Sequence, residues 1–154
     1  MKNPPVVKKL EVRYRDLDTL GHVNNAVYLE YFEEIRFAYW WKIAAMIGVT
    51  EFVGGDIPGA QFVIAETTVK YRVPIALTDT LFGATRVRSV GNRSYTMDFE
   101  LRVGDSFEGG NVAAEGDASH VFYDPKTSEV KAKPDWFLDT VSKLEGRPED
   151  AFLT

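Results

Sequence analysis

Residues 25–48 read NAVYLEYFEEIRFAYWWKIAAMIG, and the periodicity of this stretch decides the fold. Its large apolar side chains recur at spacings of three and four residues: Tyr28, Phe32, Ile35, Tyr39, Ile43 and Met46. This spacing places them on one face of an α-helix, with charged residues on the other faces. Asn24 or Asn25 suits the N-terminal cap, and Gly48 suits the C-terminal end. We therefore predict one long amphipathic helix, about 35 Å in length, which needs an equally large surface to pack against.

The segments on both sides of this helix are strand-like. β-Branched and aromatic residues, bounded by Gly, Pro and Asn, are concentrated in residues 7–15, 62–73, 80–90, 94–103 and 112–123. Tight turns such as Gly91-Asn92-Arg93 join successive strands, which then pair antiparallel. Residues 134–144 predict a short terminal helix. We predict a single α+β domain over residues 1–154, in which a sheet wraps one face of the helix, and its edge strands favour an oligomer.

The composition is that of a globular protein and excludes several classes of function. The 154 residues are 45% hydrophobic and 27% charged, with a formal net charge of −5 and no cysteine. Without cysteine there is no disulfide, thiolate metal site or cysteine nucleophile. The negative charge disfavours binding to nucleic acid. The chain also lacks a signal-like N-terminus and a run of about 18 apolar residues that could span a membrane, so we expect a cytoplasmic protein.

The loop before the predicted helix carries the richest chemistry. Residues 16–25 read DLDTLGHVNN and hold two carboxylates, a histidine, a glycine and two amides. The first turn of a helix has unpaired backbone N–H groups and a partial positive charge, which together stabilise an oxyanion. A carboxylate just upstream can attack a carbonyl carbon or activate a water molecule. By residue type alone, the same residues are also common in ordinary caps and turns.

The order of these residues resembles a known motif. Asp-x-x-Gly-His-Val-Asn-Asn-x-x-Tyr is formed here by Asp18, Gly21, His22, Val23, Asn24, Asn25 and Tyr28. It is similar to the motif of hotdog-fold acyl-CoA thioesterases of the 4-hydroxybenzoyl-CoA thioesterase-like family. Residues 69–75 (VKYRVPI) resemble the family's second strand, and residues 91–95 (GNRSY) resemble its central turn. The resemblance covers most of the chain.

The resemblance implies a fold, an activity and an assembly. The fold would be the hotdog fold, an antiparallel five-stranded sheet wrapped around one long helix. The activity would be hydrolysis of an acyl-CoA to a free acid and CoA, with no metal or organic cofactor. The protein would form a homodimer or a homotetramer built as a dimer of dimers.

The resemblance also implies roles for residues by position. Asp18 matches the carboxylate that serves as nucleophile or general base, and the backbone N–H of Asn25 matches the donor to the thioester oxygen. Gly21 permits the close approach of the loop, and Asn24 ties the loop down. His22 matches a histidine present in part of the family, where it would orient Asp18, a water molecule or the loop.

Three acidic residues near the motif are interpreted as non-catalytic. Asp16 lies outside the matched core and is expected to be a structural or charge neighbour. Another hotdog branch carries its catalytic carboxylate inside the helix, after a His-Gly-Gly element that this chain lacks. Glu33 and Glu34 are therefore interpreted as solvated helix charges.

An acidic protein must gather positive charge to hold the phosphates of coenzyme A. Candidate contacts lie on the predicted strands and in one turn: Lys70, Tyr71, Arg72, Arg86, Arg88 and Arg93. Residues two apart on a strand share a face, so Lys70 lies on the same face as Arg72, and Arg86 on the same face as Arg88. The alternative is that they are ordinary solvated strand residues. Tyr28, Tyr31 and Phe32 are candidate liners of an acyl pocket between sheet and helix, or simply core.

The sequence is also compatible with two other functions. A hotdog thioester hydratase or dehydratase would need an acid/base pair, which His22 and Asp18 could supply. A non-catalytic acyl-CoA-binding protein would bind acyl-CoA without releasing thiol. Two histidines without a spaced acidic partner do not predict a metal site.

Overall fold

The computed structural model describes residues 1–51 and 57–153. The strands are β1 (Val6–Leu10), β2 (Phe62–Tyr71), β3 (Leu81–Val90), β4 (Ser94–Val103), β5 (Asn111–Asp124) and β6 (Glu129–Val130). The helices are η1 (Tyr14–Asp16), α1 (Val27–Met46), α2 (Phe137–Glu145) and η2 (Glu149–Phe152), of which η1 and η2 are 3₁₀-helices. None of the described helices is long and apolar enough to cross a membrane.

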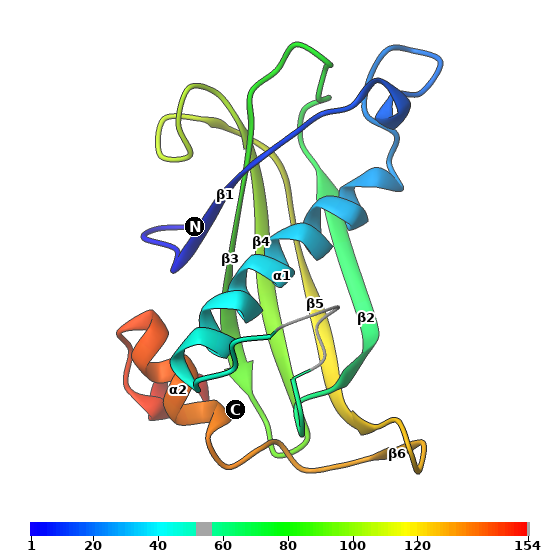
Figure 1. The fold of residues 1–154 in the computed structure, drawn as a ribbon. Helices are drawn as coiled ribbons and strands as arrows, with labels where there is room; N and C mark the ends of the chain where they lie inside the picture. Colours follow the sequence, from blue (N-terminus) through cyan, green and yellow to red (C-terminus); the bar gives the residue numbers. More distant parts are fainter. Residues whose placement is uncertain (52–56, 154) are drawn as a thin grey trace.

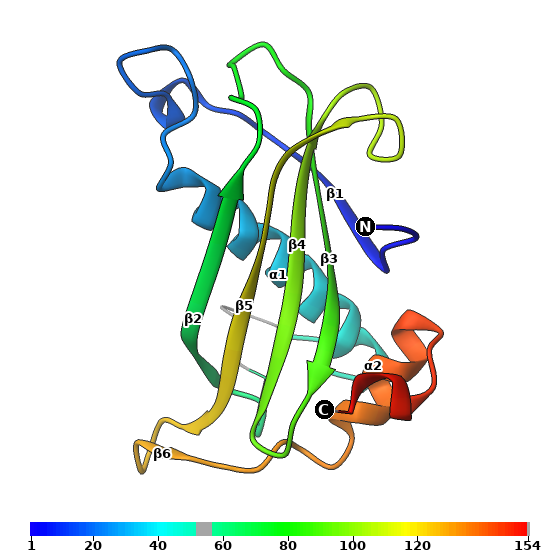
Figure 2. The same ribbon diagram turned by 180° about the vertical axis from the view of Figure 1, so that it is seen from behind.

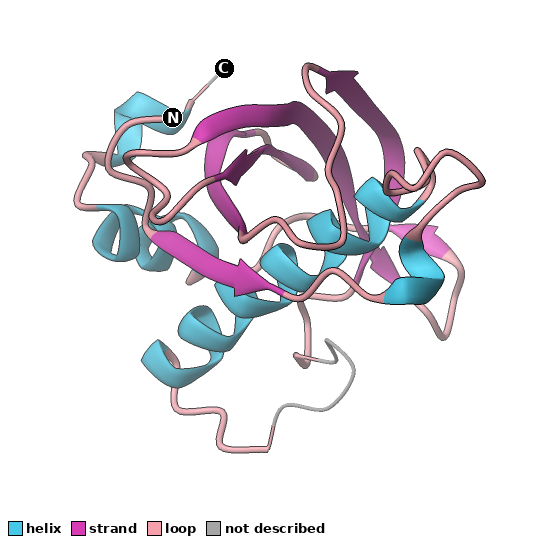
Figure 3. Cartoon of the chain, turned by 90° about the horizontal axis from the view of Figure 1, so that it is seen from above, coloured by secondary structure: helices cyan, strands magenta, loops and turns pink. Residues whose placement is uncertain are grey.

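A single antiparallel sheet wraps one face of the long helix. The strand order is β1-β3-β4-β5-β2, and the short β6 pairs with β5 beyond the main sheet. Figures 1 and 2 show α1 running diagonally across this sheet, and Figure 3 shows the sheet curving around it. This is the hotdog arrangement, so the predicted fold is confirmed.

The predicted boundaries need small corrections. The first strand ends at Leu10 instead of residue 15, because its pairing partner β3 begins at Leu81, directly opposite Leu10. The N-cap position of α1 is Ala26 and not an asparagine, although the Asn24 side chain accepts the Ala26 N–H at 3.0 Å. Gly48 ends the helix as expected, with a left-handed φ of 78°.

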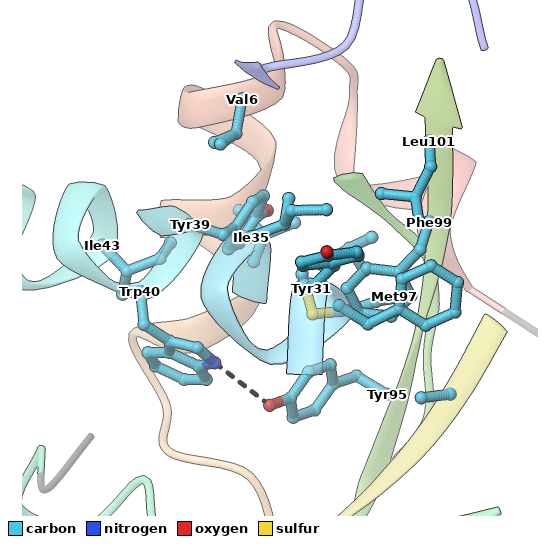
Figure 4. Packing of buried hydrophobic residues seen from close by; sticks show 14 of the residues in the cluster. Val6, Tyr31, Ile35, Tyr39, Trp40, Ile43, Tyr95, Met97, Phe99 and Leu101 are labelled. Carbon is cyan, nitrogen blue, oxygen red and sulfur yellow. Dashed lines mark hydrogen bonds between the residues drawn. The ribbon is translucent and has the colours of Figure 1, made fainter. Parts of the chain in front are cut away.

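The core lies between α1 and the middle strands of the sheet. Figure 4 shows side chains of α1 meeting those of β4 in a continuous apolar layer. Phe32 stacks on Phe99 with ring centroids 4.8 Å apart. Trp40 donates a hydrogen bond from Nε1 to the Tyr95 hydroxyl at 3.3 Å. Phe32 of the predicted helix face, together with Trp40 outside it, therefore fills the space between helix and sheet, whereas Met46 of the predicted face is 45% exposed.

Strand β2 forms one edge of the sheet. Within the described residues it pairs with β5 on one side only. Val63, Ile64 and Tyr71 on this strand are 40–47% exposed. A long edge with exposed apolar side chains favours association with another chain, and the predicted dimer or tetramer stays a prediction.

Candidate active site

Asp18 lies in a tight turn that holds one of its carboxylate oxygens. The Oδ1 atom accepts backbone N–H groups from Leu20 at 2.9 Å and from His22 at 3.2 Å. The backbone N–H of Asp18 donates to the His22 carbonyl at 2.7 Å. Gly21 closes the turn with a φ of 79°, a left-handed conformation that glycine adopts without strain. The orientation of the carboxylate is therefore fixed, and Oδ2 has no hydrogen-bond partner within the described part of the chain.

The peptide that leads into α1 presents an unpaired backbone N–H. The Asn24 carbonyl accepts the N–H of Val27 at 2.9 Å, so this carbonyl points toward the helix. In a trans peptide the N–H points opposite to the C=O, so the N–H of Asn25 points away from the helix. No hydrogen-bond partner for it occurs among residues 1–51 and 57–153. The carbonyl of Asn25 accepts the Tyr71 hydroxyl at 3.0 Å, which fixes the next peptide as well.

Asp18 and Asn25 line one pocket. Its volume is ≈ 300 Å³, and it lies between the loop before α1 and the end of β2. The other lining residues are His22, Val23, Tyr28, Tyr71, Arg72, Val73 and Pro74. The rings of Tyr28 and Tyr71 meet edge to face with centroids 4.8 Å apart. Burial is the main cause that raises the pKa of Tyr28, so this side chain stays neutral in the wall of the pocket.

The His22 side chain does not pair with the Asp18 carboxylate. The two residues are joined through backbone atoms, while the imidazole is exposed and has no hydrogen bond to Asp18. Backbone bridging to Ala76 keeps His22 at the rim of the pocket. The acid/base pair that a hydratase would need is therefore not formed in this conformation.

Asp16 is a buried neighbour of the motif, as expected, and it is more extensively hydrogen-bonded than the sequence indicated. Its side chain is 2% exposed, and its Oδ2 accepts the Tyr31 hydroxyl and the Arg13 backbone N–H, both at 2.9 Å. Burial alone would raise the pKa of Asp16, but the hydrogen bonds from Arg13 and Tyr31 outweigh burial and lower it. A weak signal exists in the sequence: Arg13 and Asp16 are three residues apart, just before the motif.

Four of the five basic candidates, all except Arg93, divide between two pockets. Arg72 lines the Asp18 pocket and forms an ion pair with Glu115. Glu115 in turn lines a second pocket of ≈ 240 Å³ that contains Lys70, Arg86 and Arg88. The Arg72–Glu115 ion pair therefore marks the boundary between the two pockets.

Carboxylates already engage the two arginines of β3. Asp98 lies 3.4 Å from Arg86 and 2.6 Å from Arg88, and Asp117 lies 2.8 Å from Arg88. Because Arg86 and Arg88 share Asp98, they lie on one face of the sheet, as expected. Asp98 and Asp117 therefore neutralise part of the positive charge of the two arginines.

The β3–β4 turn, which contains Arg93, lies at the opposite end of the sheet from the loop before α1 (Figure 1). Tyr71, which lines the Asp18 pocket, pairs with Ala114 of β5, whereas Ser94, next to Arg93, pairs with Val121. Seven residues of strand separate these positions, which corresponds to about 24 Å. The structure therefore does not bring Arg93 to the Asp18 pocket of the same chain.

The helix carboxylates behave as expected. The Glu33 side chain is 70% exposed and lies 4.0 Å from Arg36, and Glu34 lies 3.6 Å from Lys8. Both are surface charges with basic neighbours. Within the described ranges, no group of three His, Cys, Asp or Glu side chains is arranged to hold a metal ion.

The sheet wraps around one helix, and the loop that contains Asp18 lies at the start of that helix. These features are those of a hotdog-fold enzyme of the thioesterase class. The chain belongs to the thioesterase-like superfamily, whose family model matches residues 12–141. Members of this class are hydrolases that act on thioester bonds. The predicted family and enzyme class are thereby confirmed.

Individual relatives agree with this assignment. A thioesterase from Thermus thermophilus, solved in complex with coenzyme A and zinc, is 32% identical, with a TM-score of 0.78 over 96% of this chain and 99% of that one. The long-chain acyl-CoA thioesterase FadM of Escherichia coli K12 is 27% identical over 131 residues, 80% of this chain and 87% of FadM. A DHNA-CoA thioesterase from Staphylococcus aureus shares the fold at 20% identity, with a TM-score of 0.71 over 91% of this chain and 90% of that one.

Proposed function

We propose that this protein hydrolyses acyl-CoA thioesters to a free carboxylic acid and coenzyme A, in the pocket that contains Asp18 and Asn25. One observation carries the proposal. An unpartnered carboxylate oxygen, Asp18 Oδ2, and an unpartnered backbone N–H, that of Asn25, line the same pocket in the described part of the chain. The relatives from T. thermophilus and E. coli, with coenzyme A and acyl-CoA in their descriptions, support the same substrate class.

The two groups suit the two demands of thioester hydrolysis. In the general-base route, Asp18 Oδ2 takes a proton from water as the water oxygen bonds to the thioester carbonyl carbon. The carbonyl oxygen becomes an oxyanion, which accepts a hydrogen bond from the Asn25 N–H. When the carbonyl re-forms, the C–S bond breaks, and the thiolate of coenzyme A takes the proton from Asp18. A preorganised donor of this kind is worth about 2.7–4 kcal/mol in the transition state.

In the nucleophilic route, Asp18 Oδ2 itself bonds to the carbonyl carbon. The thiolate then leaves, and water cleaves the resulting mixed anhydride. Both routes use the same carboxylate and the same oxyanion donor. A single turnover in ¹⁸O-labelled water can identify the anhydride route. Label appears in the Asp18 carboxylate only if an anhydride forms and water attacks its Asp18 carbonyl carbon.

The phosphates of coenzyme A need positive charge along one path from the pocket. Arg72 lines the Asp18 pocket, and its ion pair with Glu115 joins that pocket to the one containing Lys70, Arg86 and Arg88. We therefore assign Arg72 to the near end of the coenzyme A path and the other three to its far end.

The central test is the Asp18→Asn variant, assayed by thiol release over a panel of acyl-CoA esters. An asparagine oxygen can still accept the N–H groups of Leu20 and His22, so the loop should keep its shape while the charge is lost. We expect kcat to fall by at least ~100-fold, the scale of a positioned acid or base, with an unchanged circular dichroism spectrum. Near-normal turnover by this variant would contradict the mechanism.

The same panel separates the alternative functions. Addition of water to a 2-enoyl-CoA, without thiol release from saturated esters, would indicate a hydratase. Binding of acyl-CoA with no thiol release above background would indicate a non-catalytic binding protein. The hydrolase is favoured because the His22 imidazole and the Asp18 carboxylate do not contact each other.

A further inference from the structure

The buried carboxylate of Asp16 does not line the pocket and has no part in the chemistry proposed above. Its Oδ2 accepts the Tyr31 hydroxyl, and the guanidinium of Arg13 lies 3.1 Å from its Oδ1. Tyr31 belongs to α1 and is completely buried, whereas Arg13 precedes the catalytic loop. The Asp16 side chain therefore ties the loop to the first turns of the helix.

The main chain of Asp16 continues this connection into the site. Its carbonyl accepts the N–H of Asn24 at 2.8 Å, and Asn24 immediately precedes the peptide that carries the Asn25 N–H. In the other direction, Asp18 follows Asp16 by two residues. One residue is thus joined to both sides of the site, and its own side chain is held by the helix.

The charge state of this cluster is stable near neutral pH. The donors from Arg13 and Tyr31 lower the pKa of Asp16 against the effect of burial, so the carboxylate stays ionised. Burial and the neighbouring Asp16 raise the pKa of Tyr31, so the phenol stays protonated and continues to donate.

We propose that Asp16 is a positioning residue, which sets the distance between the Asp18 carboxylate and the Asn25 N–H through its bonds to Tyr31, Arg13 and Asn24. This inference rests on the proposed function, because it concerns the geometry of the same site. Asp16 does not line the substrate pocket. Its loss should therefore lower kcat and leave KM nearly unchanged. A misplacement of ~1 Å can cost ~100-fold in rate.

The chain offers a matched control at the other end of α1. Tyr39 donates from its hydroxyl to the buried carboxylate of Glu145 at 2.8 Å, and the Val87 N–H donates to the same oxygen at 2.6 Å. This cluster repeats the geometry of the Tyr31–Asp16 pair, a helix tyrosine hydrogen-bonded to a buried acid, although burial raises the pKa of Glu145 whereas that of Asp16 is lowered. It lies eight residues further along the helix, about 12 Å from Tyr31, and shares no residue with the Asp18 pocket.

The experiment compares the two clusters in the full chain. Asp16→Asn, Tyr31→Phe and their double variant are assayed with the best ester of the acyl-CoA panel, beside Tyr39→Phe and Glu145→Gln. We expect the first two to lower kcat by ~10- to 100-fold with little change in KM. The double variant should be no slower than the slower single variant, because both remove one interaction. The two control variants should lower the melting temperature and leave kcat near that of the wild type.

Other results would overturn the proposal. Normal kcat for both Asp16→Asn and Tyr31→Phe, with a loss of stability only, would make Asp16 a purely structural residue. Loss of kcat in all four variants in proportion to lost stability would do the same. If Asp16→Asn fails to fold, Tyr31→Phe still provides the test, because it removes a single hydroxyl group. Failure of the proposed function is distinct: the wild-type protein itself would release no thiol.

Discussion

At the residue scale, the candidate site depends on which polar atoms are satisfied and which are left free. Two backbone N–H groups bind one oxygen of Asp18, and this leaves the other oxygen oriented and, among the described residues, unpaired. The carbonyl of Asn24 is bound to the helix, and this turns the Asn25 N–H outward. The loop itself fixes both groups, so in the proposed mechanism neither has to reorganise when an acyl-CoA binds. For the Asn25 N–H, this preorganisation is the condition for strong oxyanion stabilisation.

We expect a smaller catalytic effect at His22 than at Asp18. Its backbone N–H helps to hold Asp18, but its imidazole is exposed and does not contact the carboxylate. The His22→Ala variant keeps the backbone donor, so we expect kcat to fall by less than ~10-fold, well below the ~100-fold scale of a direct acid or base. Steady-state thiol release, measured beside Asp18→Asn, checks this. A loss as large as that of Asp18→Asn would make the imidazole a catalytic group.

The placement of Asp18 and Asn25 in one candidate site could be predicted from the sequence, because both belong to one short motif that resembles that of the thioesterases; their catalytic roles stay predictions. Asp18, Gly21 and Asn25 lie within eight positions; Gly21 closes the turn that holds Asp18, and Asp18 and Asn25 line one pocket. The role of Asp16 could not be predicted, because it depends on the hydroxyl of Tyr31, fifteen residues later. The ion pairs of Arg86 and Arg88 with Asp98 depend on the pairing of β3 with β4, which residue types alone do not specify.

At the element scale, helix and sheet approach closely at two glycines. A Cβ atom at Gly83 of β3 would overlap the end of the Ile35 side chain. A Cβ atom at Gly116 of β5 would lie 2.9 Å from the Phe32 ring and would also meet the Thr68 carbonyl. Aromatic and branched side chains of α1 therefore rest directly on the backbone of the sheet, which leaves little room between the two layers.

This close contact leads to a stability prediction. The Gly83→Ala variant should lose about 1–3 kcal/mol of unfolding free energy, because the added methyl group overpacks the layer. The matched control is Gly91→Ala in the β3–β4 turn, where the nearest side-chain atom would be 3.2 Å away. Urea unfolding of both variants provides the measurement. Shortening the neighbour in Gly83→Ala/Ile35→Val should restore part of the loss, and strictly additive losses would contradict the proposed clash.

The elements themselves were predictable to different degrees. The spacing of apolar residues located α1 to within two residues at each end, because a buried helix face must repeat every three to four positions. The β3–β4 hairpin also lies where expected, around Gly91-Asn92-Arg93. The end of β1 was misplaced because a strand ends where its partner ends, and β6 was missed because two residues carry no periodic signal.

At the scale of the whole molecule, one polar pair is enclosed in the core. Arg36 donates from Nε to His120 Nε2 at 2.8 Å, and the His120 ring stacks on Tyr95 at 4.4 Å. Burial, and secondly the Arg36 charge, lower the pKa of His120 to about 3. The folded protein therefore holds this histidine in its neutral form, in which Nε2 can accept the hydrogen bond.

A pH dependence of stability follows from this shift. Between pH 6.5, the ordinary pKa of histidine, and about 3, the unfolded chain binds a proton at His120 and the folded chain does not. The unfolding free energy should therefore decrease as the pH falls through this range, by up to ~1.4 kcal/mol per pH unit. Urea unfolding at a series of pH values tests this. In the His120→Gln variant this dependence should be weaker, and an identical slope in both proteins would refute the assignment.

The adjacent tryptophans of α1 are two fluorescent probes that differ in their exposure to solvent. Trp40 is 4% exposed and bonded to Tyr95, whereas Trp41 is 45% exposed on the outer face of the helix. Acrylamide should quench the fluorescence of Trp41 readily, while the emission of Trp40 reports whether the helix still rests on the sheet. Because Trp136 also fluoresces, the two signals are best read in a Trp136→Phe background. There, this neighbouring pair can distinguish separation of the helix from the sheet from changes at the outer surface of the helix.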